Sequence, residues 1–283
     1  MDTQTSISSY SSGIGGPRID RLPDPPDDDE LEHQIAPDWR YDFDVNRVEG
    51  IHQLRQDIRD AVYATDPVEE WSFILGEHLS YGNKKIGSEV AIFNVGSAND
   101  CVNLGTSQCQ VEAENCYAVR SEGNYPNTLP YRRRQQIIWE HLDAATFAKA
   151  YRRHYGRKRT AVTALRLNES GDFRTQGDIY KAEEIARRLN DIVDTYTYSA
   201  SSHLDFSTTD ALVVNRSNDH RDYGARRFEV VDTVAEIPPA GIRCPHDQSG
   251  GEIKCGECRL CIDRDAPDVF VKNFYTDSEA DHS

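Results

Sequence analysis

Seven cysteines in two separate groups constrain this chain more than any other feature of its sequence. The first group, in a loop rich in turn-forming residues, is Cys101, Cys109 and Cys116; the second, near the C-terminal end, is Cys244, Cys255, Cys258 and Cys261. The loop holds too few apolar residues for packing to explain its thiols. An odd cysteine count also argues against a full disulfide framework. Thiolates grouped in this way are typical of a soft metal ion or an iron–sulfur cluster.

The two groups predict different kinds of metal site. Three thiolates leave one coordination position open on a metal or cluster, which is typical of a working site. In the second group, two successive two-residue gaps suit three corners of a cubane 4Fe–4S cluster, and Cys244 would supply the fourth ligand. Four thiolates satisfy structural zinc equally well. Both metals remain open for the second group, whose closed site would be structural or would transfer electrons.

The charge of the chain is strongly negative and unusual in its make-up. The 283 residues carry a net charge of −16, with 48 Asp and Glu, 25 Arg and only 7 Lys. This lysine-poor, acid-rich composition resembles that of proteins from salt-loving archaea, where salt screens the self-repulsion. An ordinary acidic protein is the alternative. The acidity argues against a general nucleic-acid-coating role.

The composition predicts four consecutive regions. Residues 1–40 are rich in Ser, Gly, Pro and Asp and predict a disordered acidic tail. A helical N-terminal extension over 41–83 precedes an α/β domain over 84–274, which includes the cysteine-rich segment 244–261. Residues 275–283 form a second acidic tail. The N-terminus lacks the pattern of a secretory signal and no run of about 18 apolar residues occurs, so we expect a cytoplasmic protein with no membrane span.

Hydrophobic periodicity predicts an alternation of helices and strands through most of the chain. Helices are expected over 45–63, 68–79, 128–139, 143–155 and 176–189, and strands over 90–93, 161–167, 193–198, 211–214 and 228–231. Strands that alternate with helices favour parallel pairing. The predicted fold is therefore an α/β partial or complete parallel (β/α) barrel.

Polar residues follow the predicted strands at the points where the strands end, and sites in parallel α/β folds form at that edge. In addition to the first cysteine loop, these residues are Asn94, Glu169, Ser170, Asp172, Ser199, Ser201, Asn215, Asn218 and Asp219. We assign candidate catalytic roles to Asp172 and Ser170 and candidate cofactor-binding roles to Glu169, Ser199 and Asn94. The alternative for Asp172 is a turn that caps the following helix. Arg166, within a strand, would neutralise Glu169 or Asp172.

Two basic clusters stand out in so acidic a chain. They consist of Arg132, Arg133 and Arg134, and of Arg152, Arg153, Arg157, Lys158 and Arg159. Such clusters suit phosphate or nucleic acid. Solvated helix faces paired with nearby carboxylates are the equal alternative.

The order of these motifs resembles two known groups of proteins. A three-cysteine loop after the first strand of a predicted barrel, with an aromatic residue beside the last cysteine, resembles the cluster loop of radical S-adenosylmethionine enzymes, although the spacing differs from the usual three-then-two pattern. A closer resemblance, over residues 84–274, is to the phage "gene product 88" domain family. It rests on Lys85-Ile86-Gly87, Phe93-Asn94, Cys116-Tyr117-Ala118, on Arg166 with the run from Glu169 to Phe173, and on the terminal cysteines.

These resemblances imply an iron–sulfur protein of a virus or mobile element. The first resemblance implies a 4Fe–4S cluster on Cys101, Cys109 and Cys116, with S-adenosylmethionine on the open iron and radical chemistry on an unknown substrate. The second implies no settled activity, since none is known to us for that family. A zinc-stabilised nucleic-acid-binding or adaptor protein is the alternative function.

Overall fold

The computed structural model describes residues 43–83, 85–106, 108–109, 111, 113–157, 161–217 and 225–272. Both predicted tails, 1–40 and 275–283, lie outside the described residues. Four further predicted residues also lie outside the described ones. They are Lys158 and Arg159 of the second basic cluster, and Asn218 and Asp219 of the expected sheet edge.

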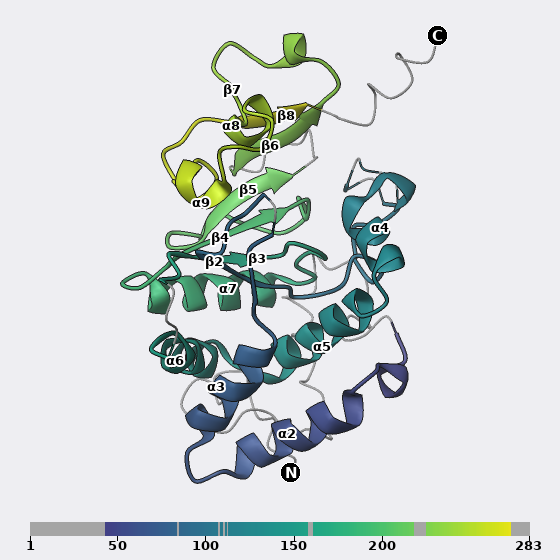
Figure 1. Cartoon of the computed structure of the whole chain (residues 1–283), viewed down its shortest axis with the longest axis vertical. Coiled ribbons are helices and arrows are strands. Elements are labelled where there is room, and N and C mark those ends of the chain that lie inside the picture. The colour runs from purple at the N-terminus through teal and green to yellow at the C-terminus, as the bar shows by residue number, and fades with distance from the viewer. Residues whose placement is uncertain are drawn as a thin grey trace, which may run out of the picture.

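An open sheet forms the centre of the molecule (Figure 1). Its eight described strands are β1 (Ser80–Tyr81), β2 (Val90–Phe93), β3 (Ala164–Leu167), β4 (Asp194–Ser199), β5 (Val213–Ser217), β6 (Arg226–Val231), β7 (Ile242–Arg243) and β8 (Val269–Lys272). They are ordered β1-β2-β3-β4-β5-β6-β8-β7, and β1 alone in this set runs antiparallel to its neighbour.

The predicted α/β class and parallel pairing are confirmed. A complete barrel is wrong, because β1 and β7 are open edges. Since β1 precedes residue 84, the sheet begins before the predicted domain boundary.

The five helices expected from the periodicity of the sequence are all present, and the described helices over 117–124, 245–248 and 255–258 were not expected. The described helices are α2 (Ile51–Tyr63), α3 (Pro67–Glu77), α4 (Tyr117–Asn124), α5 (Thr128–His141), α6 (Ala144–Tyr155), α7 (Gln176–Leu189), α8 (Pro245–Gln248) and α9 (Cys255–Cys258), with the 3₁₀ turns η2 (Val45–Arg47), η3 (Ala113–Asn115) and η4 (Val234–Glu236). Side-chain caps at Asp66, Asp143 and Thr175 start α3, α6 and α7. The helix expected over 45–63 begins at Ile51, because Gly50 adopts φ 78°. None of the described helices has the length and apolar character that crossing a bilayer requires.

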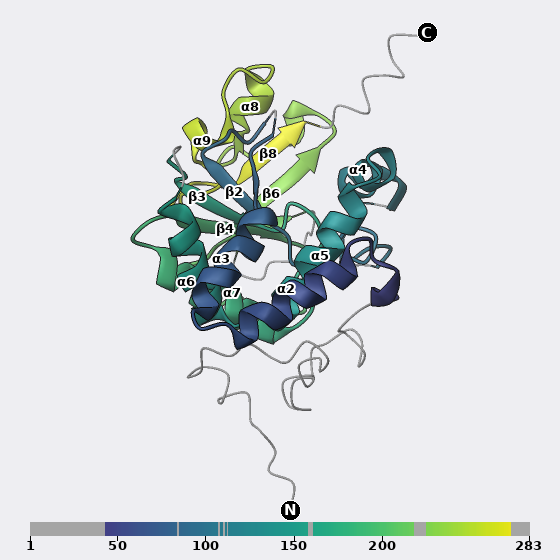
Figure 2. The same cartoon turned by 60° about the horizontal axis from the view of Figure 1, so that its bottom comes forward.

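The main hydrophobic core lies between the sheet and one layer of helices. Side chains of β2 and β3 that face this layer include Phe93, Leu165 and Leu167, all fully buried. Trp71 of α3 and Ile58 of α2 belong to the same core. α3 packs against α6 and α2 packs against α3 on this side of the sheet, as Figure 2 shows. The predicted N-terminal extension is therefore part of the body of the domain.

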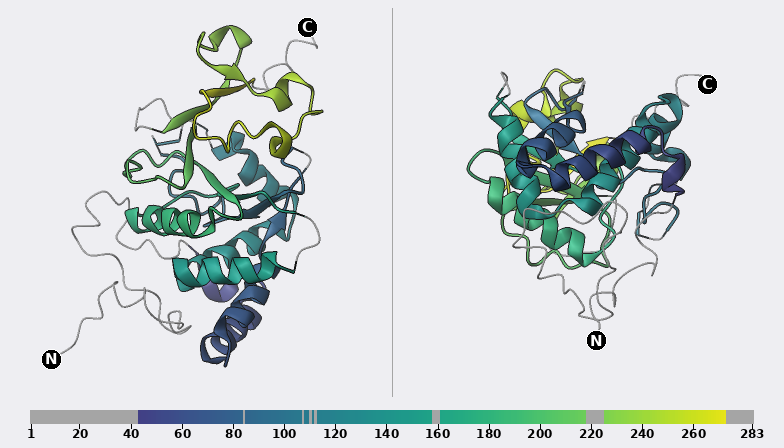
Figure 3. Two further views of the ribbon diagram at one scale, coloured as in Figure 1. Left: turned by 90° about the vertical axis from the view of Figure 1, so that its left-hand side faces the viewer. Right: turned by 90° about the horizontal axis from the view of Figure 1, so that it is seen from below.

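The other face of the sheet is covered by the C-terminal segment. Ile262 and Cys261 pack on Ile92, Ala164 and other side chains of that face. Figures 1 and 3 show α8 and α9, drawn in yellow-green to yellow, on the side of the sheet away from α6 and α7. The two cysteine groups thus reach the sheet by different routes, one from the loop after β2 and one across this second face.

The loops after β2 and β3 cross in close contact at the carboxyl edge of the sheet. Gly171 has φ 71°, and a Cβ atom built there would lie 2.7 Å from the carbonyl carbon and oxygen of Gly96. Only glycine fits this position, because both the backbone conformation and the neighbouring backbone exclude a side chain. The crossing fixes Asp172 relative to the cysteine loop.

A pair of glycine substitutions tests this crossing. Gly171→Ala adds both left-handed strain and the backbone clash, whereas Gly105→Ala, at φ 69° with open space around it, adds the strain alone. We expect Gly105→Ala to lower the free energy of unfolding by about 1–2 kcal/mol and Gly171→Ala to lower it by about 1–3 kcal/mol more. Urea unfolding of both variants measures the difference. Equal losses would contradict a close crossing at Gly96.

Candidate functional site

The buried carboxylate of Glu122, in α4, holds the loop that leads to the first cysteine. It accepts hydrogen bonds from the backbone N–H groups of Ala98 (2.7 Å) and Asn99 (3.0 Å) and from the hydroxyl of Ser170 (3.1 Å). The guanidinium of Arg132, in α5, lies 2.8 Å away, with both side chains almost fully buried. A paired, hydrogen-bonded charge of this kind is costly to disrupt, so Glu122 ties the loop to two helices.

Asp100 anchors the same loop one residue before Cys101. Arg133 donates to both of its carboxylate oxygens at 2.7 Å, and the hydroxyl of Ser97 also binds the carboxylate. Arg174 donates to the Asp100 carbonyl at 2.9 Å. A bidentate guanidinium–carboxylate pair fixes orientation as well as position. Two of the three arginines that were predicted to contact nucleic acid therefore hold the cysteine loop.

The three thiols of the first group lie near one another at the carboxyl edge of the sheet. Burial raises the pKa of Cys101, and the carboxylate of Asp172 and the thiols of Cys109 and Cys116 raise it further. All three cysteines are free and partly buried. The structure thus places Cys109 and Cys116 within electrostatic range of Cys101, with Asp172 on the same side of the sheet, as the order of the chain predicts.

Asp172 is a buried junction between three loops. Its carboxylate accepts from Ser199 Oγ (2.7 Å), Asn103 Nδ2 (2.8 Å) and the backbone N–H groups of Phe173 (2.8 Å) and Ala200 (2.7 Å). Burial raises its pKa to about 6, against the opposing effect of these donors. Asp172 and Ser199 therefore meet as expected. The Asp172 carboxylate joins the loops after β3 and β4 to the cysteine loop.

Sequence reasoning missed Asn103, which is buried and lies two residues after Cys101. Its amide donates to Asp172 and also to the hydroxyl of Ser201, each at 2.8 Å. Nothing in the local pattern distinguishes this asparagine from those of an ordinary turn. Its proximity to Cys101 was the one available signal.

The other three candidates lie beside the Glu122 carboxylate and a neighbouring cleft. Ser170 binds Glu122, and its backbone N–H donates to Asn94 Oδ1 at 2.9 Å. Glu169 accepts from Asn83 at 2.8 Å and lies 3.6 Å from Arg132. The structure places Ser170 and Asn94 in supporting contacts at the sheet edge.

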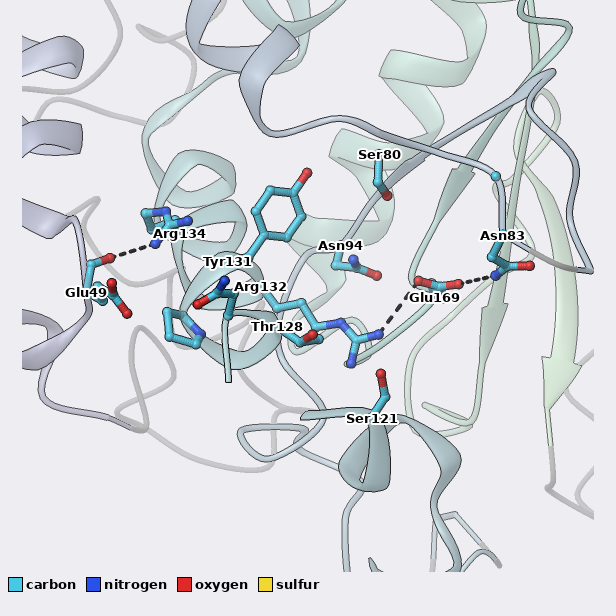
Figure 4. Close-up of a pocket in the computed structure, with 13 residues that line it drawn as sticks. Glu49, Ser80, Asn83, Asn94, Ser121, Thr128, Tyr131, Arg132, Arg134 and Glu169 are labelled. Atoms are coloured by element: carbon cyan, nitrogen blue, oxygen red, sulfur yellow. Dashed lines mark hydrogen bonds and ion pairs between the residues drawn. The ribbon is translucent and has the colours of Figure 1, made fainter. Parts of the chain in front are cut away.

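A polar cleft of about 600 Å³ opens next to these residues. Figure 4 shows Arg132 and Asn83 pointing toward Glu169 from opposite sides, with Tyr131 and Arg134 farther along the wall. The cleft contains both signs of charge as well as amide and hydroxyl groups. A ligand that enters here would reach Asn94 and Glu169, two of the predicted cofactor-binding residues.

The second cysteine group lies against the face of the sheet opposite the helical layer. The backbone N–H of Cys255 donates to the Lys85 carbonyl at 3.0 Å, and Asn215 Nδ2 donates to the Cys261 carbonyl at 2.9 Å. Cys244 is buried, and electrostatic interactions link the thiols of Cys255 and Cys261 to it and to each other. Cys258 interacts in the same way with Cys255. The four predicted ligands therefore lie within electrostatic range of one another on the same face of the sheet.

Both cysteine groups fit a soft metal by their donor chemistry. Among the described residues, no set of three or more His, Cys, Asp or Glu side chains is arranged to hold a metal ion as it stands. The fit therefore rests on the thiols themselves, and binding would require them to draw closer together.

The second basic cluster, on α6 and the residues after it, is paired with acidic side chains of α3 and of the turn after α7. Arg152 binds Asp191, Arg153 binds Asp66 and Glu69, and Arg157 binds Glu69. Arg134, in the first cluster, donates to the Glu49 carbonyl at 2.7 Å. These contacts match the alternative of charged faces paired with nearby carboxylates.

Comparison with known proteins gives one match. A model of the family described as gene product 88 matches residues 77–264, which is more than half of the chain. No curated protein and no solved structure matches it. The matched region includes both cysteine groups and all of the candidate site residues.

Replacing the buried carboxylate tests whether Glu122 organises the site. Glu122→Gln removes the closer carboxylate of a buried pair and leaves Arg132 with Glu169 at 3.6 Å, so we expect a loss of about 3–5 kcal/mol in the free energy of unfolding. The control is Glu184→Gln, which removes a partly exposed pair with Arg188 and should cost less than about 1 kcal/mol. Urea unfolding and protease cleavage within residues 95–106 are the measurements. A loss for Glu122→Gln no larger than the control would contradict the assignment.

Proposed function

This chain belongs to the gene product 88 family, and we propose that it is an iron–sulfur protein whose working site is the first cysteine group. The observation that carries the proposal is the gathering of Cys101, Cys109 and Cys116 beside Asp172 at the carboxyl edge of a parallel sheet. That edge is where α/β folds bind ligands. Three thiolates leave a position for a ligand that the chain does not supply.

A partial barrel is part of this proposal. Strands β2 to β6 follow one another in sequence and in space, and every neighbouring pair among them is parallel. The cysteine loop follows the first of these strands. This arrangement supports the likeness to radical S-adenosylmethionine enzymes that the sequence indicates.

The residues of the site have distinct roles in this proposal. Cys101, Cys109 and Cys116 would hold a 4Fe–4S cluster, which when bound supplies an open coordination position and one-electron chemistry toward S-adenosylmethionine. The hydrogen bond from Ser199 to Asp172 holds together the loops that lie around the thiols. Glu169 and Asn94 offer polar contacts at the mouth of the cleft. Glu122 and Asp100 hold the loop in position, and the carboxylate of Asp172, whose pKa burial raises to about 6, lies close enough to Cys101 to act on its thiol.

The second cysteine group would hold a closed four-thiolate site. Cys244, Cys255, Cys258 and Cys261 suit a second cluster, and zinc is the alternative metal. Because this segment packs on Ile92, Ala164 and Tyr196, a metal there would stabilise the packing of the segment on this face of the sheet.

The alternative function is a zinc-stabilised nucleic-acid-binding or adaptor protein of a mobile element. The basic clusters favoured this alternative function. Five of their arginines, however, bind carboxylates of the chain itself, namely Arg132, Arg133, Arg152, Arg153 and Arg157. A net charge of −16 also opposes binding to a polyanion. The lysine-poor, acidic composition instead supports a halophilic origin, which we propose alongside the iron–sulfur assignment.

Anaerobic iron reconstitution tests the main proposal. We expect a brown protein with about four irons at the first group, and Cys116→Ala should remove that iron while leaving the second site occupied. Ser121→Ala, in the same helical segment but without a thiol, is the control and should keep all of its iron. Iron analysis and the visible spectrum are the measurements. A colourless protein that holds only zinc would refute the proposal.

The division into working and structural sites predicts different costs of losing one thiol. Cys258→Ser should lower Tm by about 6–12 °C, the shift that ~3 kcal/mol produces in a chain of this size, because metal binding at the second group is coupled to folding. Cys116→Ser should leave a folded protein with one site lost, because the first loop is held by Glu122 and Asp100.

Thermal unfolding and metal content of the two serine variants are measured together. Severe unfolding in both would contradict the division. Full metal content at both groups in either variant would show that the ligands are misassigned.

A further inference from the structure

Arg134, on the wall of the polar cleft, differs from the other described arginines of the two basic clusters. Those five all form ion pairs with carboxylates of the chain, whereas Arg134 forms none within its described part. Its guanidinium donates from Nη1 to the carbonyl oxygen of Glu49 at 2.7 Å. Most of its five N–H donors therefore remain available to a further acceptor. In a chain with a net charge of −16, the cleft thus contains a positive charge that no carboxylate neutralises.

The backbone of Gly50 leaves room for this guanidinium. A Cβ atom built on Gly50 would lie 3.4 Å from Nη1 of Arg134 and 3.7 Å from its Cδ. Gly50 also has φ 78°, a conformation that favours glycine. The Arg134 side chain is therefore packed along a bare stretch of backbone. Figure 4 shows it at the end of the cleft away from Glu169.

Tyr131, one turn before Arg134 in α5, supplies a second donor at this end of the cleft. Its ring stacks on His78, with ring centres 5.8 Å apart and planes 12° from parallel. Burial raises the pKa of Tyr131 while the charge of Arg134 opposes that rise, so the phenol keeps its proton at neutral pH. Among the described residues its hydroxyl has no hydrogen-bond partner. A guanidinium and a phenol hydroxyl are thus both available to one oxyanion.

The cleft also adjoins the start of α5, where Asn127 and Thr128 are part of its wall. The side chain of Asn127 does not cap this 14-residue helix, and the first turn contains no acidic residue. The N-terminus of a helix carries a partial positive charge. This partial charge has the same sign as Arg134 and adds to the attraction for an anion.

The rest of the cleft wall carries neutral hydroxyl groups and one carboxylate. Ser80 of β1, Ser121 of α4 and Thr128 contribute hydroxyls that form no hydrogen bond within the described ranges. A hydroxyl both donates and accepts, whereas the carboxylate of Glu169, at the other end, accepts only. These groups suit the hydroxyls of a ligand better than a second anion. Arg132 does not change this balance, because Glu122 already neutralises it.

We propose that this cleft binds a small hydroxylated molecule that carries one phosphate or carboxylate group. The oxyanion would lie against Arg134 and Tyr131, and the hydroxyls would lie against the serine, threonine and Glu169 side chains. The volume of about 600 Å³ falls within the range of small-molecule sites in proteins. The inference goes beyond the proposed function, since it requires no metal and no cysteine.

Calorimetric titration of the full-length protein tests the inference with four probes: ribose 5-phosphate, gluconate, inorganic phosphate and ribose. The lowest salt concentration at which the chain stays folded is used, because salt screens the charge of Arg134. We expect ribose 5-phosphate or gluconate to bind at least about 10-fold more tightly than ribose, since hydrogen bonds to a charged group are the stronger ones. The tighter of the two anions shows whether the ligand carries a phosphate or a carboxylate.

Two single substitutions test the oxyanion end of the cleft. Tyr131→Phe keeps the ring that stacks on His78 and removes only the hydroxyl, while Arg134→Gln removes the charge. Each should weaken binding of the tighter anionic probe on the order of 10-fold or more. Arg264→Gln is the matched control. It removes an arginine that likewise donates to backbone carbonyls, those of Thr209 and Leu212, and it should bind as the parent does.

Glu169→Gln tests the hydroxyl end, with effects of opposite sign on two probes. The variant removes a negative charge from the cleft while Arg132 keeps Glu122, so inorganic phosphate should bind as tightly as before or more tightly. Ribose 5-phosphate loses a charged acceptor for its hydroxyls. Its affinity relative to that of inorganic phosphate should therefore fall, and a ratio that stays unchanged would overturn the placement of the hydroxyls.

Several results would overturn the proposal as a whole. These are no binding of either anionic probe at millimolar concentrations, unchanged binding in both Tyr131→Phe and Arg134→Gln, or an equal loss in Arg264→Gln. Urea unfolding shows that each variant is folded, and if Arg134→Gln is not, Tyr131→Phe decides. Probe binding in a protein that takes up no iron would refute the iron–sulfur assignment and leave the cleft standing. Iron uptake without probe binding would give the reverse result.

Discussion

The ion pair between Glu122 and Arg132 is the constraint on which the candidate site depends. A turn-rich loop has no hydrophobic surface of its own with which to hold three thiols in place. The buried carboxylate replaces that surface with backbone hydrogen bonds from Ala98 and Asn99, and α4 and α5 position the carboxylate. The ion pair between Asp100 and Arg133 holds the same loop in a similar way, closer to Cys101. Charged pairs that are buried and fully hydrogen-bonded give the loop a defined geometry that apolar contacts would not.

The two cysteine groups lie in opposite electrostatic surroundings on the same sheet. The charge of Asp172 disfavours a thiolate at Cys101 in the first group, while Lys85 favours one at Cys255 and Arg226 at Cys261 in the second. Such a difference suits two sites with different tasks. The sheet separates them by its geometry, because one group follows the carboxyl end of β2 and the other covers the face of β3 and β4.

Particular residues show how far the sequence leads. Cys101 and Asp172 were predicted to meet because both follow parallel strands, and they do. For Arg132 the sequence left open a contact with phosphate or a pairing with a carboxylate, and the structure pairs it with Glu122. Its partner Glu122 lies one helix earlier, and periodicity describes each helix separately without stating which faces of two helices meet. Asn103 was missed for the same reason, since its partners Asp172 and Ser201 lie in loops that follow β3 and β4, far along the chain.

The sequence by itself determined the five longest helices, the central strands β2 to β6 with their parallel pairing, and the division of the cysteines into two groups, but not β1, β7, β8 or the short helices α4, α8 and α9. These features depend on short-range preferences: hydrophobic period, capping side chains such as Thr175, and ligand spacing. Tertiary structure alone decided that the sheet stays open and that most of the described arginines in the basic clusters find acids of the chain. Each of these depends on contacts between residues far apart in the chain, where the close packing of side chains, and not local preference, selects the partner.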